Sequence, residues 1–274
     1  MLLAPFNEFQ WKVSNWDGLT GTTVTPGTSS AEGTWTQLLS ATAEEIWAFV
    51  LSVSSGNAAG KDKCMLLDIG IDPAGGTNYT AIVNSLACGG TDGFPGGYNA
   101  VFPLKIPAGS TIAVRVQGFN GTPGTVAVRF TGYGCPSRPE LVAAGQCSET
   151  VGSVASSKGV SFTPGNAAEG AWASLGVTVA DLWNWRVCAQ VGNTIQTALS
   201  VNVDLAFGDG TNMVMLIENY IIRTNASEIS QYLSHDNIAG INKFVPAGST
   251  LYVRGYCDAA PNTGWNAVAV GIGG

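Results

Sequence analysis

Charged residues are scarce in this chain. Asp, Glu, Lys and Arg make up only 11% of its 274 residues, against roughly 25% in a typical soluble domain. The net charge of −7 and the lack of a basic run argue against a nucleic-acid-binding surface. So few charges indicate either an unusually large core or an outer surface partly buried against other chains. The thin sandwiches predicted below leave little room for a large core, so we expect extensive subunit contacts.

Long apolar runs and reactive clusters are also absent. The longest apolar stretches, near residues 46–51 and 213–217, fall well short of the ~20 residues that a membrane-spanning helix needs. We therefore expect no membrane span. The six cysteines form no C-x-x-C pair and have no histidine nearby in the sequence, so we expect neither a metal site nor a cofactor.

Nothing in the sequence signals secretion, because its first residues lack a basic group and a long apolar segment. We therefore expect reduced, buried thiols rather than disulfides. Cys135 and Cys147 flank a linker and are the pair that we expect if a disulfide does form.

Helix signals are few, and one of them, Pro139-Glu-Leu-Val-Ala-Ala144 in the linker, could form a short helix. Thr42-Ala-Glu-Glu45 and Thr178-Val-Ala-Asp181 resemble capping boxes, and each predicts a single helical turn. Elsewhere, apolar and polar residues alternate in short runs between turn-forming residues, with 36 Gly and 12 Pro in the chain. This period of two is typical of half-buried strands.

One nonapeptide occurs twice. Pro107-Ala-Gly-Ser-Thr-Ile-Ala-Val-Arg115 returns as Pro246-Ala-Gly-Ser-Thr-Leu-Tyr-Val-Arg254, and each copy reads as a turn followed by a strand. Glu32-Gly-Thr-Trp35 likewise returns as Glu169-Gly-Ala-Trp172. Matches in a common register over so long a distance indicate a duplicated domain rather than a short-period repeat.

The alternating pattern within each repeat predicts about eight strands. In the first they lie near residues 22–25, 34–40, 46–54, 64–72, 79–87, 100–106, 111–117 and 125–131. For the last strand, we match Val126, Val128 and Phe130 to Val268, Val270 and Ile272. Eight short strands in ~110 residues favour two packed sheets. The prediction is an all-β fold of two tandem, jelly-roll-like β-sandwich domains.

We expect four segments along the chain: an aromatic-rich N-terminal arm at residues 1–21, a first sandwich at 22–134, a linker at 135–157 and a second sandwich at 158–274. Around Trp11, apolar and polar residues of the arm alternate as in a strand. The arm either packs as a first strand on its own domain or docks on a neighbouring subunit, because terminal segments are ordered only when something holds them.

Candidate catalytic residues are few. The single histidine, His235, lies between Ser and Asp, but the chain has no G-x-S-x-G elbow. Asp68 with Asp72, and Asp204 with Asp209, have the residue types of a glycosidase pair. Asp72 and Asp209 fit hairpin turns better, where Asp bonds local backbone. We therefore expect no catalytic residues and a protein that is not an enzyme.

Two aspartates and two arginines occupy matching positions in the repeats. By the strand alternation, Asp68, Arg115, Asp204 and Arg254 all point outward. We expect cross-strand ion pairs Asp68–Arg115 and Asp204–Arg254 that set the strand register. Exposed pairs of this kind contribute roughly 0–1 kcal/mol.

The eight tryptophans could form stacking surfaces for sugars. Four of them recur at matched strand positions, namely Trp35, Trp47, Trp172 and Trp183. We therefore expect these four, and Trp185, to lie in the core.

The loop at residues 89–99 has no close counterpart in the second repeat. It is rich in glycine and carries Phe94 and Tyr98. Binding residues commonly lie on such loops above a rigid scaffold, so Phe94 and Tyr98 are the candidate binding residues. The alternative is a simple mobile insertion.

The segments Ile106–Arg115 and Val245–Arg254 resemble the pattern I-P-A-G-S-x-I-x-V-R in jelly-roll modules of tailed-bacteriophage tail, fibre and head-appendage proteins. The resemblance implies a structural virion component, made in the bacterial cytoplasm, whose partners are copies of itself and other virion proteins. The alternative that we consider is a host-attachment protein that binds a host-surface glycan. The resemblance carries over no catalytic or binding residues.

Overall fold

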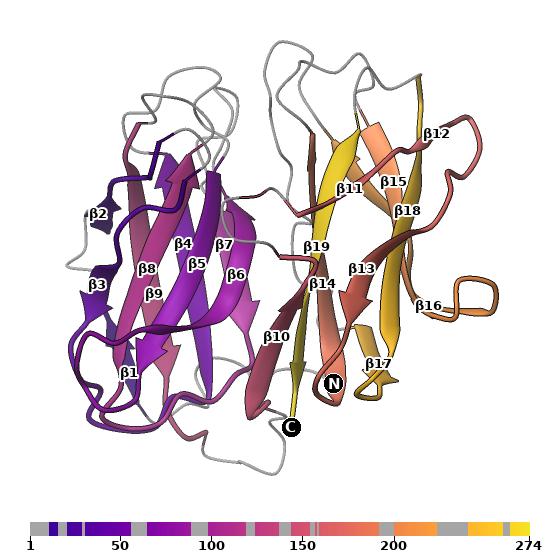
Figure 1. Cartoon of the computed structure of the whole chain (residues 1–274). Helices are drawn as coiled ribbons and strands as arrows, with labels where there is room; N and C mark the ends of the chain where they lie inside the picture. The colour runs from indigo at the N-terminus through magenta and orange to yellow at the C-terminus, as the bar shows by residue number, and fades with distance from the viewer. Residues whose placement is uncertain are drawn as a thin grey trace.

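The computed structural model describes residues 11–15, 21–28, 31–55, 65–88, 98–118, 124–136, 144–153, 157, 159–191, 200–223, 241–259 and 264–274. Within these ranges every regular element is a β-strand. Figure 1 shows the strands gathered into two layered bodies that lie side by side. The predicted all-β fold is confirmed.

The first sandwich consists of two facing sheets. One has the order β2 (Thr22–Val24), β9 (Val126–Tyr133), β4 (Ala48–Ser55) and β7 (Tyr98–Phe102). The other has the order β3 (Thr36–Leu39), β8 (Thr111–Gly118), β5 (Met65–Asp72) and β6 (Thr80–Cys88). This distribution of eight strands over two antiparallel sheets is that of a jelly roll.

The second sandwich repeats this order strand for strand. Its first sheet contains β11 (Val160–Phe162), β19 (Trp265–Gly273), β14 (Leu182–Val191) and β17 (Ile241–Val245). Its second contains β13 (Ala173–Val177), β18 (Thr250–Cys257), β15 (Ser200–Gly208) and β16 (Met213–Arg223). The short strand β12 (Gly165–Asn166) runs parallel to β18. The common strand order confirms the duplication.

Each sandwich also has an added strand beside its closing strand. In the arm, β1 (Lys12–Ser14) pairs with β9 of the same sandwich. Within the segment expected to be a linker, β10 (Cys147–Val151) pairs with β19 in the same manner. Of the two alternatives for the arm, its described part therefore packs on its own domain. The first and second sandwiches were expected to start at residues 22 and 158. Each in fact includes an earlier strand, β1 in the first and β10 in the second.

The register of the central strands fixes which residues of the two repeats are equivalent. Gly132 of β9 lies opposite Phe49, and Gly271 of β19 lies opposite Trp185. A Cβ at either glycine would lie within 3 Å of core side chains. Both repeats therefore need a glycine here, and Gly271 is the counterpart of Gly132.

The match of the last strands made from sequence is wrong. Val128 lies opposite Val53, and the residue opposite the corresponding Ala189 is Ala267, not Val270. Val128 and Ala267 face the core of their own sandwich, whereas Val270 packs on the first sandwich. A shift by an odd number of residues moves every side chain of a strand to the opposite face.

The repeated nonapeptide forms a turn that a threonine holds. Gly109 and Gly248 have φ angles of 83° and 81°, the conformation that the third residue of a type II turn requires. The Thr42 amide donates to the Ser110 carbonyl at 3.0 Å, and the Thr42 carbonyl accepts from the Gly109 amide at 2.8 Å. Thr178 makes the equivalent two bonds with the second turn.

The predicted helical turns at residues 42–45 and 178–181 are wrong, because neither segment is helical. The backbone groups of Thr42 and Thr178 are engaged by the turns described above. The hydroxyl of Thr178 also donates to the Pro246 carbonyl at 3.0 Å. What resembled a local helix cap is therefore a contact between distant segments.

The disulfide considered as an alternative, between Cys135 and Cys147, is not formed. Both residues are free thiols, as are Cys188 and Cys257. Burial raises the pKa of Cys257 to about 11, which keeps this thiol protonated and inert at neutral pH. In the part of the chain that the structure describes, no helix is long and apolar enough to cross a membrane.

Replacing Gly248 by Ala is expected to destabilise the protein by about 1–2 kcal/mol, the cost of a left-handed conformation for a residue with a Cβ. No atom lies within 4 Å of the position of the new Cβ, so strain rather than a clash would be the cause. Urea denaturation measures the loss. Gly248→Asn is the matched control because Asn tolerates this conformation better, and an equal loss in both variants would contradict the explanation.

Candidate functional site: matched bulges and the contact between the sandwiches

Each sandwich has a bulge in an edge strand that a buried aspartate holds. Ser85 of β6 and Asn219 of β16 both have a φ angle of 53°, and the ladder register shifts there in both strands. A bulge leaves an amide without a partner in the ladder. Asp68 Oδ1 accepts from the Ser85 amide, and Asp204 Oδ1 accepts from the Asn219 amide, each at 2.7 Å. The aspartates thus satisfy amides that the bulges expose.

The second carboxylate oxygen of each aspartate binds an arginine on the neighbouring strand. Arg115 lies opposite Asp68, with 2.7 Å between Nε and Oδ2, and Arg254 lies opposite Asp204, with 2.9 Å between the same atoms. Both predicted ion pairs are confirmed. The expected exposure is wrong, since Asp68 is only 6% exposed and Asp204 only 1%. Removing one partner would therefore leave a buried charge, which costs far more than breaking an exposed pair.

A glutamate and a tryptophan cover each ion pair. Glu32 Oε2 lies 2.6 Å from Arg115 Nη1, and the guanidinium carbon lies 4.7 Å from the centre of the Trp35 ring. The second sandwich repeats both contacts, with Glu169 3.3 Å from the arginine Nε and the Trp172 ring centre 4.3 Å from the guanidinium. The repeated Glu-Gly-x-Trp segment is therefore the cover of the ion pair, a role that the sequence analysis missed.

Four tryptophans expected in the core lie elsewhere. Trp35 and Trp172 cover the ion pairs, and the ring centre of Trp47 lies 3.8 Å from a lysine ammonium. Trp183 packs in the contact between the sandwiches. Trp185 alone of the five is buried in its own core as expected. A cation over the ring gives a half-buried tryptophan a favourable partner outside the core.

The cluster of the second sandwich carries more negative charge than that of the first. The bulge residue next to Asn219 is Glu218, whereas the corresponding residue next to Ser85 is Asn84. Burial is the largest cause of the raised pKa of Glu169. The charge of Asp204 raises this pKa further, and the charge of Arg254 lowers it. The surroundings therefore raise the pKa of Glu169 above that of a solvated glutamate.

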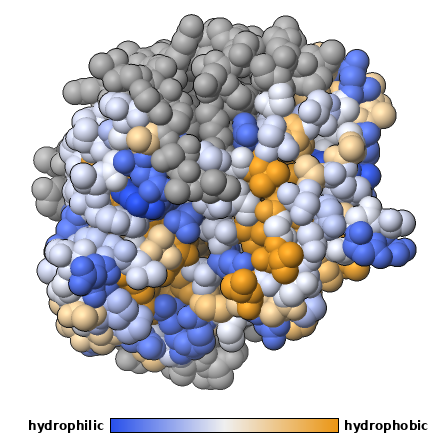
Figure 2. Space-filling model, in the orientation of Figure 1, coloured by the Kyte–Doolittle hydropathy of each residue, from blue (hydrophilic) through white to orange (hydrophobic). Residues whose placement is uncertain are grey.

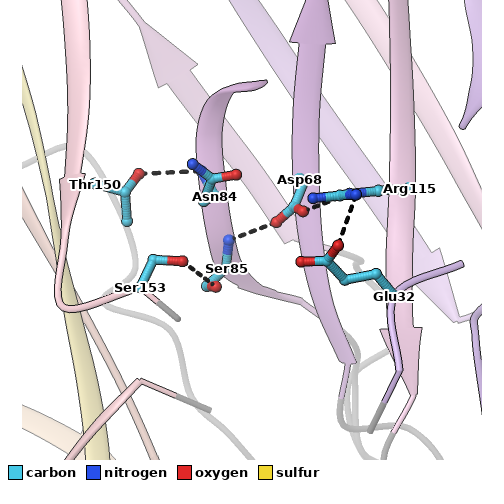
Figure 3. A network of polar contacts seen from close by, with 7 residues as sticks. All are labelled: Glu32, Asp68, Asn84, Ser85, Arg115, Thr150 and Ser153. Carbon is cyan, nitrogen blue, oxygen red and sulfur yellow. Dashed lines mark hydrogen bonds and ion pairs between the residues drawn. The ribbon is translucent and has the colours of Figure 1, made fainter. Parts of the chain in front are cut away.

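In the first sandwich the bulge is part of the contact with the second (Figure 3). The backbone N–H of Asn84 donates to Thr150 Oγ1 at 3.0 Å, and the hydroxyl oxygens of Ser85 and Ser153 lie 2.8 Å apart. The hydroxyl of Ser148 donates to the carbonyl of Ile82. Side chains of β10 and of the residues after it thus bond the free edge of β6. The chain of contacts runs from the Asp–Arg pair through the bulge to the neighbouring sandwich.

Much of the rest of this contact is apolar, besides main-chain bonds of Gly145 with Pro103 and Lys105. The sheet β10-β19-β14-β17 turns its outer face to the first sandwich (Figure 1) and packs side chains on the cluster that contains the first core: Trp183, Cys188, Val268, Val270 and Ile272. The guanidinium of Arg186 lies 4.6 Å from the centre of the Phe102 ring. This sheet is therefore covered on both faces, which accounts within one chain for part of the apolar excess that we attributed to subunit contacts.

The carboxylates considered for catalysis serve the backbone. Asp72 accepts from the amides of Ala74 and Asn78, and Asp209 accepts from those of Thr211 and Asn212. These bonds confirm that both aspartates stabilise hairpin turns. The Asn212 and Thr211 donors lower the pKa of Asp209 to about 2. Within the described ranges no group of His, Cys, Asp and Glu could hold a metal ion, and His235 lies outside them.

Of the two candidate binding residues, Phe94 and Tyr98, the structure describes the backbone of Tyr98. Phe94 lies outside the described residues. Tyr98 is the first residue of β7, and its backbone lies opposite Val53 of β4. A binding role for Phe94 and Tyr98 remains a prediction.

Comparison with solved structures finds similar chains at low sequence identity. PNGase F, a glycosylasparaginase from Flavobacterium meningosepticum, has 11% identity and a TM-score of 0.38, with 96% of each chain covered. The tandem CBM22 domains of Paenibacillus barcinonensis Xyn10C have 12% identity and a TM-score of 0.27, with 99% of this chain and 96% of that chain covered. A Sulfolobus Turreted Icosahedral Virus structure has 9% identity and a TM-score of 0.38, covering 96% and 89%. No family model and no curated protein matches the chain.

These comparisons correct one expectation. From the sequence we excluded an enzyme. That exclusion is wrong, because a glycosylasparaginase is among the structures to which the chain is similar. Each TM-score lies below 0.5, so the jelly-roll assignment rests on the strand order given above.

Replacing Asp204 by Ala is expected to destabilise the protein by about 3 kcal/mol, because the change leaves Arg254 without its buried partner and the Asn219 amide without an acceptor. Asp204→Asn should cost less, since it keeps an acceptor oxygen for the amide. Glu169→Gln is the matched control and should cost less than Asp204→Ala, because Glu169 is partly exposed and its replacement leaves the buried Asp204–Arg254 pair in place. Urea denaturation compares the three variants, and equal losses for Asp204→Ala and Glu169→Gln would contradict the assigned roles.

Proposed function

We propose that the protein is a structural component of a bacteriophage particle, a head-decoration, tail or appendage protein that acts by assembly with copies of itself and other virion proteins. The observation that supports this proposal best is the contact between the two sandwiches. There, the bulged edge of one jelly roll bonds to the first strand and outer sheet face of the next. Side chains make much of this contact, alongside main-chain bonds of Gly145 with Pro103 and Lys105, so surfaces of a similar kind can join separate chains.

The distribution of exposed apolar residues supports the same proposal. Among the described residues, the large apolar side chains that remain exposed all belong to the second sandwich: Val177, Val179, Val214, Ile221 and Phe244. Figure 2 shows hydrophobic groups open at the surface on one face of the molecule. A contiguous group of such side chains on a folded body indicates contact with a partner, whereas single exposed apolar residues are common.

Assembly can be measured directly in solution. The purified protein is expected to form oligomers at micromolar concentration, because the proposed role requires contacts between copies. Size-exclusion chromatography with light scattering gives the mass of the species present. A stable monomer over this range would overturn the proposal.

A second candidate function is attachment to a host-surface glycan. It is favoured by the place of the loop that carries Phe94: β6 ends at Cys88 and β7 begins at Tyr98, so the loop joins the edge strands of two sheets. Loops anchored in this way on a rigid sandwich are common binding sites. In this candidate function, Phe94 and Tyr98 would stack on a sugar ring.

Replacing Phe94 or Tyr98 by Ala is expected to weaken glycan binding by up to about tenfold each, through loss of ring stacking. A glycan array with the wild-type chain identifies the ligand, and titration of the two variants gives the change. Their thermal unfolding should match that of the wild type. Folded wild-type protein that binds no glycan on the array would reject this second function.

A further inference from the structure

The edge of the second sandwich formed by β16 and β17 is the counterpart of an edge that is already docked. In the first sandwich, β6 and β7 are the last strands of their sheets, and this edge lies against the second sandwich. In the second, β16 and β17 end the corresponding sheets. The bulge residues Glu218 and Asn219, which correspond to Asn84 and Ser85, are exposed.

Apolar side chains lie open along this β16–β17 edge. Val214 and Ile221 on β16 are 50% and 56% exposed, and Phe244 on β17 is 59% exposed. Lys243 donates from Nζ to the carbonyl of Met215 at 2.6 Å, which links the two strands across the edge. A lysine that occupies an edge carbonyl disfavours the addition of a further strand. The edge is therefore suited to docking by side chains, like its counterpart in the first sandwich.

The register also identifies the surface that would receive this edge. Ser148 and Thr150 of β10, which bond the docked edge, lie opposite Ile272 and Val270. In the first sandwich, Tyr133 and Thr131 of β9 correspond to Ile272 and Val270. Lys12 and Ser14 of β1 lie opposite these two residues. The outer face of β1 and β9 is thus the counterpart of the surface on which β6 docks.

We propose that the β16–β17 edge of one chain docks on the outer face of β1 and β9 of a second copy, in the arrangement that joins the two sandwiches within one chain. The proposal rests on the proposed assembly function and names the surfaces that serve it. Such a contact uses two different patches of the chain, so it is head-to-tail and generates a closed ring or a filament.

Charge favours this pairing. Lys12 is exposed and corresponds to Ser148, the donor to the β6 edge, while Glu218 is exposed and corresponds to Asn84 on that edge. In this arrangement Glu218 meets Ser14, the counterpart of Thr150, and Lys12 lies two residues away on the same face of β1. Where the second sandwich presents Val268 and Val270, the first presents Arg129 and Thr131. A more polar face is typical of a contact between bodies that fold separately.

The first test removes the apolar part of the edge. Ile221→Lys and Phe244→Lys are each expected to weaken self-association at least about tenfold, because each places a charge where the proposed contact would bury an apolar side chain. Val179→Lys is the matched control: Val179 is 82% exposed and lies outside the β16–β17 edge, so its variant should associate like the wild type. Sedimentation velocity over a concentration series measures association, and circular dichroism confirms folding.

The second test exchanges charges. Glu218→Lys and Lys12→Glu should each weaken association several-fold, and the double variant should recover most of the loss because opposite charges face each other again. Recovery would not follow if the two residues lay in unrelated contacts. A wild-type chain that stays monomeric would overturn the proposed function itself. Oligomers that persist unchanged in the Ile221, Phe244 and Glu218 variants would overturn this docking surface and leave the assembly function standing.

Discussion

A buried carboxylate that holds a bulged amide is the interaction on which the rest of the structure depends. Asp68 binds the amide of Ser85 and the guanidinium of Arg115 at once, so it fixes both the bulge and the register of two neighbouring strands. The bulge in turn places Asn84 and Ser85 where residues of the second sandwich can bond them. Without the carboxylate, the edge that joins the sandwiches would lose its shape.

The duplication preserved this interaction and changed the surfaces around it. Asp204 and Arg254 repeat the pair almost atom for atom. In contrast, the outer face of the closing strand carries Val268 and Val270 in one repeat but Arg129 in the other. Groups that hold the strand frame tolerate little change, because their loss leaves buried polar atoms unpaired. Surface residues are free to diverge toward a permanent contact in one copy and a more polar face in the other.

Much of the frame could be predicted from sequence, because alternation along a strand and repeated spacing are local signals. The strands and the Asp68–Arg115 pair follow from such signals. The burial of that pair did not, since its cover comes from Glu32 and Trp35, which are distant in sequence. Alternation around Val270 shows that one face is apolar but not what covers it, so the contact between sandwiches could not be derived. The binding role expected for Phe94 rests on composition alone.

The position of β10 has a consequence for the order in which the protein can be completed during synthesis. This strand bonds the edge of the first sandwich through its side chains, yet its own backbone partner is β19. Of the described strands, β19 leaves the ribosome last. The first jelly roll can therefore close early, while the polar edge of β6 must wait in water until translation of the second half is nearly finished. Until then, that edge is the part of the nascent chain most open to chaperones or to premature association with another copy.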